Sequence, residues 1–461
     1  MRIRHILTFA LLAVASLAAS AATPKYIFYF IGDGMGMGPV MAAETYNRTI
    51  LNNPNRLLMM QFPVASAAMT YSASSNVTDS AAAGTALSTG TKTKNSMLGM
   101  APDTTDVYSI AVDLAKLGYG IGIGTTVAAD DATPGAFYAH VPNRGMSYEI
   151  DTQFATSGVT FLAGAGLRSI KNDKGEYTDV LDRLAANNYQ VVYGPEGIKD
   201  IKSDKVVLLS PIGTDANNAG YTIDSIAGSL NITQITEACL KQLQKTSPEH
   251  FFMMIEGGNI DHALHANDGG AAIKEILSFN EALEVAFRFY QQHPDETLIV
   301  VTADHDTGGM ALIGPKGAKG GLANIDYQRV SKEVFGQYCE GILRSRMVYT
   351  WNDMKEYLSD KLGFWSHIKL SDNQTDKLKD LFTRTFELRN TADQKTLYAN
   401  FNAFAVEVFR IFNDATGLAF TTTSHSGNPV PVYAVGAGAD AFKALNNNTD
   451  IPRAILRLVK E

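Results

Sequence analysis

Short apolar runs recur along the chain and end at turn-forming or acidic residues. They lie at residues 26–31, 120–127, 206–209, 251–255, 298–302 and 430–435. Continuous apolar runs of this length are typical of strands buried on both faces, which belong in a parallel sheet covered by helices. Helical patterns lie between several of them, for example at 110–117 and 272–290. The alternation predicts an α/β fold with a large, mostly parallel central sheet flanked by helices.

A more charged and mainly helical pattern occupies residues 316–416. Three helical faces within it are apolar: Met354, Tyr357, Leu358 and Leu362; then Leu378, Leu381 and Phe382; then Phe404, Val408, Ile411 and Phe412. Such faces pack onto a core. Two interpretations fit this insertion: it is an extra helical layer on the core, or it forms a cap over the active site or an oligomer contact.

The first residues differ from the rest of the chain. Arg2, Arg4 and His5 precede an apolar run at 6–19, and small residues follow at 19–22. This order is typical of a cleaved signal peptide, and the run is too short for a comfortable membrane span. A buried N-terminal helix is the alternative. We predict a signal peptide at 1–22 and a catalytic domain at 23–461, periplasmic or secreted, with no membrane attachment after cleavage.

The overall composition is that of a soluble globular protein, with 45% hydrophobic and 19% charged residues. The formal net charge is −8, and because no basic patch is visible, no nucleic-acid partner is expected. The two cysteines, Cys239 and Cys339, lack the spacing of a metal site. An oxidising compartment would permit a disulfide between them, which the sequence leaves open.

Potential metal ligands follow several of the predicted strands. Ligands bind at the carboxyl ends of strands in open α/β sheets, so residues at these positions are candidates for chemistry. Each one alone could equally cap a helix. Their recurrence at four strand ends favours a metal site. They are Asp33, Glu256, Asp304 and His305, with Asp131 and Thr133 shortly after the run at 120–127.

Three further segments add ligands and a nucleophile. Asp261 and His265 are four residues apart, so on a helix they project from one face and can hold one metal. A surface hydrogen bond is the alternative for this pair, and His425 in a polar loop offers a third ligand. Ser80 begins a run of small residues that predicts a tightly packed helix. A helix N-terminus favours an anion, and a serine beside a dication can attack phosphorus, although Asp79 or Ser80 could also simply cap the helix.

Together these segments resemble the alkaline phosphatase family, from about residue 25 to the last predicted strand. The motifs are Gly32 to Gly36 around Asp33, Asp79-Ser80-Ala81, Asp131 to Pro134, Glu256 through His265, Asp304-His305 and the segment starting at His425. Arg144 stands at the family's interval for the arginine that binds phosphate. The resemblance implies hydrolysis of small-molecule phosphate monoesters, and also a homodimer.

The resemblance also implies a site with two Zn²⁺ ions and one Mg²⁺ ion. One zinc would be held by Asp261, His265 and His425, and the second by Asp33, Asp304 and His305; magnesium would be held by Asp33, Thr133 and Glu256. Ser80 would attack the monoester and become phosphorylated, and water would then release phosphate. Two metals can stabilise the entering and leaving oxygens, and Mg²⁺ prefers oxygen ligands whereas zinc accepts imidazole.

At two positions that vary within the family, this chain has an unusual combination of residues. Asp131 resembles many bacterial members, whereas His262 resembles the animal enzymes. Both are expected near the substrate or the magnesium site. The alternatives are a phosphodiesterase of the same superfamily and a non-catalytic phosphate- or metal-binding protein. Thr133, Glu256 and Arg144 argue against the first, and the complete set of ligands and nucleophile argues against the second.

Overall fold

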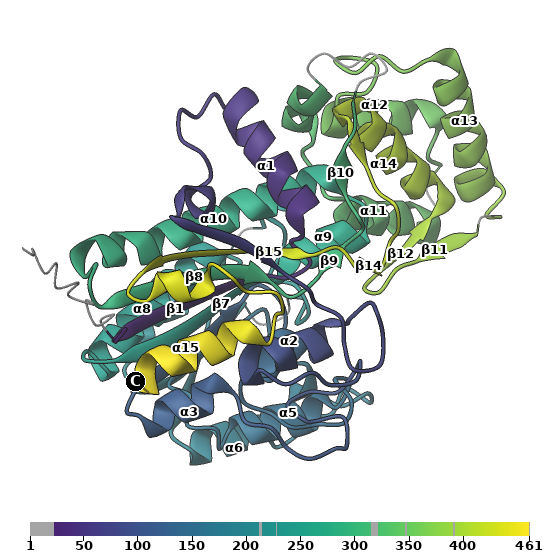
Figure 1. The fold of residues 1–461 in the computed structure, drawn as a ribbon. Coiled ribbons are helices and arrows are strands. Elements are labelled where there is room, and N and C mark those ends of the chain that lie inside the picture. Colours follow the sequence, from purple (N-terminus) through teal and green to yellow (C-terminus); the bar gives the residue numbers. More distant parts are fainter. Residues whose placement is uncertain are drawn as a thin grey trace, which may run out of the picture.

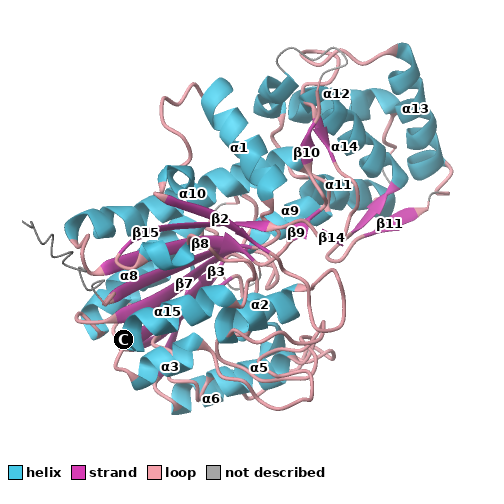
Figure 2. Ribbon diagram, in the orientation of Figure 1, coloured by secondary structure: helices cyan, strands magenta, loops and turns pink. Residues whose placement is uncertain are grey.

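A nine-stranded sheet forms the centre of the protein in the computed structural model, which describes residues 23–211, 214–226, 228–314, 321–345, 348–390 and 392–460. The strand order is β2-β15-β8-β1-β7-β3-β4-β6-β5. Helices cover both faces, giving three layers (Figures 1 and 2). The strands are β1 (Tyr26–Gly32), β2 (Val64–Ala68), β3 (Gly120–Thr125), β4 (Phe161–Gly164), β5 (Tyr189–Tyr193), β6 (Lys205–Leu209), β7 (Phe251–Gly257), β8 (Thr297–Ala303) and β15 (Val430–Gly436).

The two helical layers come from different parts of the chain. One face of the sheet is covered by α8 (Ile232–Thr246) and α10 (Gly269–Gln292). The opposite face carries α2 (Ser80–Thr89), α3 (Ile110–Lys116) and α15 (Asp450–Lys460) (Figure 1). The remaining helices of the main body are α1 (Met37–Thr49), α4 (Ala132–Gly135), α5 (Ser147–Phe154), α6 (Val180–Ala186), α7 (Gly194–Gly197) and α9 (Gly258–His265).

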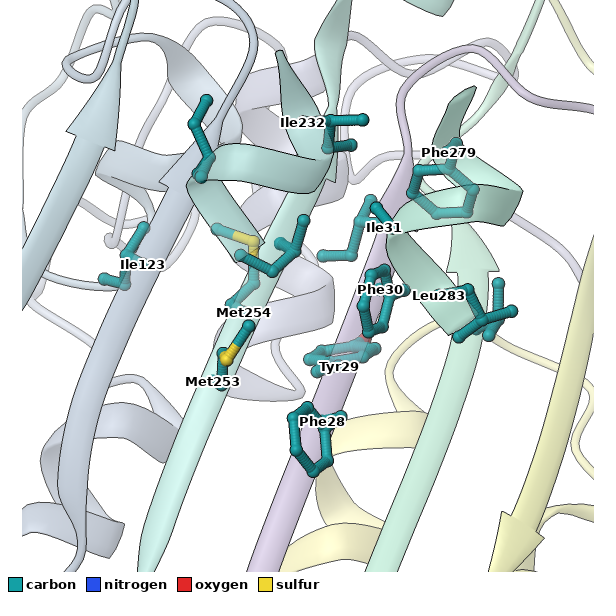
Figure 3. Packing of buried hydrophobic residues seen from close by; sticks show 14 of the residues in the cluster. Phe28, Tyr29, Phe30, Ile31, Ile123, Ile232, Met253, Met254, Phe279 and Leu283 are labelled. Carbon is teal, nitrogen blue, oxygen red and sulfur yellow. The ribbon is translucent and has the colours of Figure 1, made fainter. Parts of the chain in front are cut away.

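Strand β1 shows why the apolar runs are continuous. Phe30 packs edge to face on Phe279 of α10, with ring centroids 5.7 Å apart. Both of these residues are labelled in Figure 3. Tyr29, the neighbour of Phe30, points to the opposite layer, where its ring lies 6.2 Å from that of Phe137. Alternate side chains of a strand face opposite sides, so a strand covered by helices on both sides is apolar at every position.

The predicted α/β class is confirmed, and all six predicted strands are present. The sheet differs from the expectation in the direction of one strand, and it contains three strands that were not predicted. Strand β15 runs antiparallel to both β8 and β2, because an apolar run indicates burial but carries no information about direction. The additional strands are β2, β4 and β5; β4 has only four residues, and β2 and β5 are partly exposed.

Residues 321–416 form a separate helical lobe, which lies at the upper right in Figure 1. Its elements are α11 (Lys332–Arg344), α12 (Trp351–Leu362), α13 (Asp372–Phe382), the strands β11 (Asp393–Lys395) and β12 (Asn400–Asn402), and α14 (Ala403–Thr416). The three predicted apolar faces meet in a hydrophobic cluster distinct from that of the sheet. The lobe therefore has a hydrophobic core of its own, and its role as a cap or as an oligomer contact stays a prediction.

Both cysteines are free and buried, in different hydrophobic clusters. Cys239 packs in α8 against the sheet, and Cys339 lies in α11 of the lobe. The predicted signal peptide at 1–22 lies outside the described residues. Within the described ranges, no helix has both the length and the apolar character needed to cross a membrane.

Candidate metal centre and active site

Three adjacent strands deliver carboxylates to one edge of the sheet. Strand β1 lies between β7 and β8, with Gly32 in register with Gly257 and with Ala303. Asp33 and Asp304 each follow directly after their strand, and Glu256 is the penultimate residue of β7. All three side chains are buried. The parallel register therefore places three carboxylates beside one another, as the sequence predicted.

Gly34 allows the turn after β1 to approach the neighbouring ligands. Its φ of +68° is a conformation that glycine adopts without strain. A Cβ atom there would lie 2.6 Å from Asp261 Oδ1 and 2.9 Å from Thr307 Oγ1. Its backbone N–H donates to Asp304 Oδ1 at 3.0 Å. Glycine is thus required for close packing around Asp33.

The three residues predicted for the first zinc form a compact group. Helix α9 supplies Asp261 and His265, and His425 comes from β14 (His425–Ser426), which pairs with β9 (Asp306–Thr307). The ligand atoms of all three lie within 4.8 Å of one another. His265 Nε2 is 3.3 Å from Asp261 Oδ2 and 3.0 Å from His425 Nε2.

The hydrogen bonds of the two histidines determine which nitrogen atoms carry protons. His265 Nδ1 lies 2.6 Å from the Thr423 carbonyl, and His425 Nδ1 lies 2.8 Å from the Thr78 carbonyl. Carbonyl oxygens only accept, so both Nδ1 atoms donate. Burial lowers the pKa of His425 to about 3, so its ring is neutral. The Nε2 lone pair of His425 therefore faces His265 Nε2 and the Asp261 carboxylate, and an Nε2 atom left free by an Nδ1 hydrogen bond is typical of metal-ligating imidazoles.

A second group surrounds His305. Its Nε2 atom lies 3.0 Å from Asp304 Oδ2, 3.4 Å from Asp33 Oδ1 and 3.1 Å from Ser80 Oγ. The predicted second ligand set, together with the serine, is therefore assembled at one point. Asp261 also belongs here, because its carboxylate lies within 4.8 Å of the ligand atoms of Asp33 and His305. Asp261 thus faces both groups.

Thr307, which the sequence analysis did not select, links the two groups. Its hydroxyl donates to Asp261 Oδ1 and lies 3.1 Å from His305 Nδ1. Because its one proton goes to the carboxylate, the hydroxyl accepts from Nδ1–H, which directs the Nε2 atom of His305 toward Asp304, Asp33 and Ser80. Thr307 therefore fixes the orientation of two ligands. The only feature of the sequence that could have pointed to Thr307 was its position three residues after Asp304.

Ser80 is the first residue of α2, and Asp79 performs the capping. Asp79 Oδ1 accepts from the Ala82 backbone N–H at 3.0 Å, and Oδ2 accepts from Ser96 N–H at 2.8 Å. Ser80 is fully buried and its hydroxyl faces His305. The helix is packed tightly, as predicted, since every residue from Ser80 to Ser88 is buried. The segment was considered for helix capping and for nucleophilic attack. Asp79 caps the helix, so the Ser80 hydroxyl is available for nucleophilic attack.

Arg144 is held beside Ser80 by carboxylates. Its Nη2 donates to Asp131 Oδ1 at 3.1 Å, and its Nη1 lies 4.0 Å from Asp79 Oδ2. Arg168, also missed in the sequence, lies 3.2 Å from the same Asp131 oxygen and donates to Asp130. Burial favours a higher pKa for Asp131, but the two guanidinium groups lower it to about 2. Asp131 is therefore a fixed anion that orients Arg144.

The donor atoms at this edge fit divalent cations. Five of the buried oxygens that have no hydrogen-bond partner among the described residues lie at this edge: Asp33 Oδ1, Thr133 Oγ1, Glu256 Oε1, Asp261 Oδ2 and Asp304 Oδ2. Unpartnered buried oxygens are costly, and carboxylate, hydroxyl and imidazole donors suit Mg²⁺ or Zn²⁺. Burial, helped by neighbouring carboxylates, raises the pKa of Asp33 well above its ordinary value and that of Glu256 to about 8. A cation would stabilise the charged forms.

His262 lies next to these ligands but is turned toward the lobe. Its ring stacks on that of Tyr398, with centroids 3.7 Å apart and an interplanar angle of 30°. Burial lowers its pKa to about 4, so the ring is neutral. Tyr398 was also missed, because it lies far along the chain in a segment without a recognisable motif.

A serine at a helix N-terminus, beside two carboxylate–imidazole groups and an anchored arginine, defines a site suited to a metal-dependent phosphoryl-transfer hydrolase. The family model for alkaline phosphatase matches residues 24–460, and the chain belongs to this family. The protein is accordingly a hydrolase of phosphate monoesters.

Individual relatives agree with this assignment. Alkaline phosphatase 4 of Bacillus subtilis is 29% identical over 452 residues, which cover 95% of this chain and 89% of that relative. A cold-active alkaline phosphatase from a psychrophilic Shewanella species has a TM-score of 0.79 at 24% identity, covering 95% of this chain and all of the other. A variant of the TAB5 alkaline phosphatase, described with Mg bound in its M3 site, has a TM-score of 0.66 at 25% identity, covering 95% and 99%.

Proposed function

We propose that the protein hydrolyses phosphate monoesters through a phosphoserine intermediate at Ser80. The observation that carries the proposal is the position of Ser80 Oγ, 3.1 Å from His305 Nε2, at the edge of a cluster of buried ligands. In the first displacement the Ser80 hydroxyl gives up its proton to solvent and its oxygen bonds to phosphorus. The bond from phosphorus to the alcohol oxygen breaks at the same time, and the departing alkoxide takes a proton from solvent. In the second, water attacks phosphoserine, releases inorganic phosphate and restores the hydroxyl.

The metal assignments follow the ligand groups. Asp261, His265 and His425 would hold one zinc, and Asp33, Asp304 and His305 the second. Asp33, Thr133 and Glu256 would hold magnesium, which is consistent with their oxygen-only donors and with the Mg described in the TAB5 variant. When bound, these ions would lower the pKa of an oxygen nucleophile and stabilise the leaving oxygen.

The protein's own groups orient the substrate. Asp131 holds one terminal nitrogen of Arg144, while the other, at 4.0 Å from Asp79, is beyond hydrogen-bond distance of that carboxylate. Arg144 therefore has donors to offer to two phosphoryl oxygens, which a guanidinium binds in bidentate fashion. The N-terminus of α2 adds a favourable dipole for the anion.

The test uses p-nitrophenyl phosphate and bis-p-nitrophenyl phosphate at alkaline pH. We expect strong monoesterase activity that a chelator removes and that zinc plus magnesium restores. Ser80→Ala should lower turnover by roughly a thousandfold or more, because the covalent route is lost. Faster turnover of the diester would instead assign the protein to the phosphodiesterase branch. Export after loss of residues 1–22 and assembly as a homodimer remain predictions.

A further inference from the structure

A β-hairpin of the helical lobe carries a tyrosine to the active site. Strands β11 and β12 pair antiparallel, with Lys395 opposite Asn400, so that residues 396–399 form the tip. Tyr398 at this tip stacks on His262 at 3.7 Å and meets the edge of His265 at 5.3 Å between ring centroids. The lobe therefore contacts the group of residues proposed to act on the leaving oxygen.

The tip has a defined conformation. The Thr396 hydroxyl donates to the Ala399 carbonyl at 2.8 Å and accepts from the Ala399 N–H at 3.1 Å. The Thr396 backbone N–H also donates to the same carbonyl, at 2.8 Å. These bonds close the turn around Tyr398, whereas the neighbouring Leu397 is 57% exposed. Tyr398 is thus presented by an ordered turn.

The hairpin is also anchored to the helix that bears the ligands. Phe401 of β12 is buried in the lobe, and the Lys332 ammonium lies 4.5 Å from the centre of its ring. Lys332 Nζ donates to the carbonyl of Ala266, the residue directly after α9, at 2.7 Å. His262 and His265 belong to α9, so a short chain of contacts connects the hairpin to both rings. The position of Tyr398 over them is therefore set by packing on both sides.

The surroundings of the Tyr398 hydroxyl are strongly polar. The phenolic oxygen lies within electrostatic range of Asp261, Arg144 and Asp131. Within the part of the chain that the structure describes, the hydroxyl of this half-buried side chain makes no hydrogen bond. A donor without a protein partner, within electrostatic influence of the arginine proposed for phosphate, is available to a substrate.

We propose that Tyr398 is a substrate-positioning residue, whose hydroxyl donates a hydrogen bond to a phosphoryl oxygen and whose ring bounds the leaving-group side of the site. This inference rests on the proposed function, because it takes Arg144 as the phosphate ligand and the His265 group as the leaving-group side. The lobe would then contribute to catalysis through the Tyr398 side chain, within the same subunit as the active site. The ring would favour flat aromatic leaving groups over flexible alkyl ones, since an aromatic wall gains contact with a planar partner.

The experiment compares Tyr398→Phe and Tyr398→Ala with wild type, using Leu397→Ala at the same turn as the control. Inorganic phosphate binding is measured by calorimetry on metal-loaded protein, and metal content is measured for each variant. We expect Tyr398→Phe to weaken phosphate binding about three- to tenfold with unchanged metal content, which corresponds to one lost hydrogen bond. Leu397→Ala should bind phosphate as wild type does.

Kinetics with an aryl and an alkyl phosphate give the second readout. Tyr398→Phe should raise KM more than it lowers kcat for both substrates, whereas Tyr398→Ala should also reduce the preference for the aryl ester. If Tyr398→Phe binds phosphate as wild type does, or loses affinity only together with metal, the inference is wrong. A wild-type protein that neither binds phosphate nor turns over monoesters would overturn the proposed function itself.

Discussion

The sheet edge and the helical lobe contribute to the site in different ways. The sheet edge supplies most of the proposed metal ligands from strand ends and short adjoining helices, and the small β9–β14 ribbon adds His425. The lobe has its own hydrophobic cluster and reaches the site through the Tyr398 hairpin. It is joined to the main body through polar contacts of Asp268, Lys332 and Asn413 near the end of α9. Under the two proposals above, the sheet edge determines the reaction and the lobe adjusts which substrates enter it.

The largest effect is expected at Asp261, which faces both ligand groups. Asp261→Asn removes a negative charge that faces both groups and a carboxylate ligand of the first, so we expect kcat/KM to fall by more than roughly a hundredfold and metal content to drop. Activity and bound metal are measured on the same preparation. Asp204→Asn, at a side chain that is 82% exposed, is the control. Full metal occupancy with normal activity in Asp261→Asn would show that the two groups do not share this carboxylate.

Thr307→Val should have a smaller effect, because it removes an orienting hydroxyl and no ligand. The change leaves Asp261 and His305 without their common partner, and loss of such a partner typically weakens metal binding by about 10- to 100-fold. Chelator competition measures the affinity. Thr307→Ser keeps the hydroxyl and should restore most of it. Equal affinities in the valine and serine variants would contradict the orienting role.

The smallest effect is expected at Asp268, on the boundary between the two regions. Its carboxylate accepts from Gln328 Nε2 at 2.8 Å and from the Lys332 backbone N–H at 2.7 Å. Asp268→Asn turns one acceptor into a donor facing these groups, which should cost about 1–3 kcal/mol of unfolding free energy. Activity per folded molecule should change little. A hundredfold loss of activity would show that the lobe controls the chemistry itself.

The same variant should change the pH dependence of stability. Burial raises the pKa of Asp268 from 3.8 to about 6 in the folded protein. Between pH 3.8 and 6 the Asp268 carboxyl is protonated in the folded state and ionised in the unfolded state. Its contribution to the unfolding free energy is therefore fully present below pH 3.8 and is lost as the pH rises through 6. Wild type should therefore lose roughly 1 kcal/mol per pH unit relative to Asp268→Asn over this interval. Denaturant unfolding of both proteins at several pH values measures the difference, and a constant difference would contradict the raised pKa.

Much of the sheet region could be predicted because its chemistry lies next to recognisable local patterns. Asp33, Glu256 and Asp304 each stand at the end of an apolar run, and the i, i+4 spacing placed Asp261 and His265 on one helical face. The direction of β15 could not be predicted, since strand polarity depends on tertiary connections. In the lobe the apolar faces were predicted correctly, and the contribution of Tyr398 was not. That side chain reaches the site only because the hairpin docks against α9. No local sequence pattern indicates this tertiary contact.

The central claim is that Ser80 carries the phosphoryl group during turnover. The most direct measurement is acid quenching of the metal-loaded enzyme during hydrolysis of a phosphate monoester, followed by mass spectrometry of its peptides. The account predicts one added phosphoryl group, located on Ser80 in the peptide that contains the start of α2, and no such label in Ser80→Ala. Turnover at the normal rate with no phosphorylated peptide, or with the group on another residue, would contradict it.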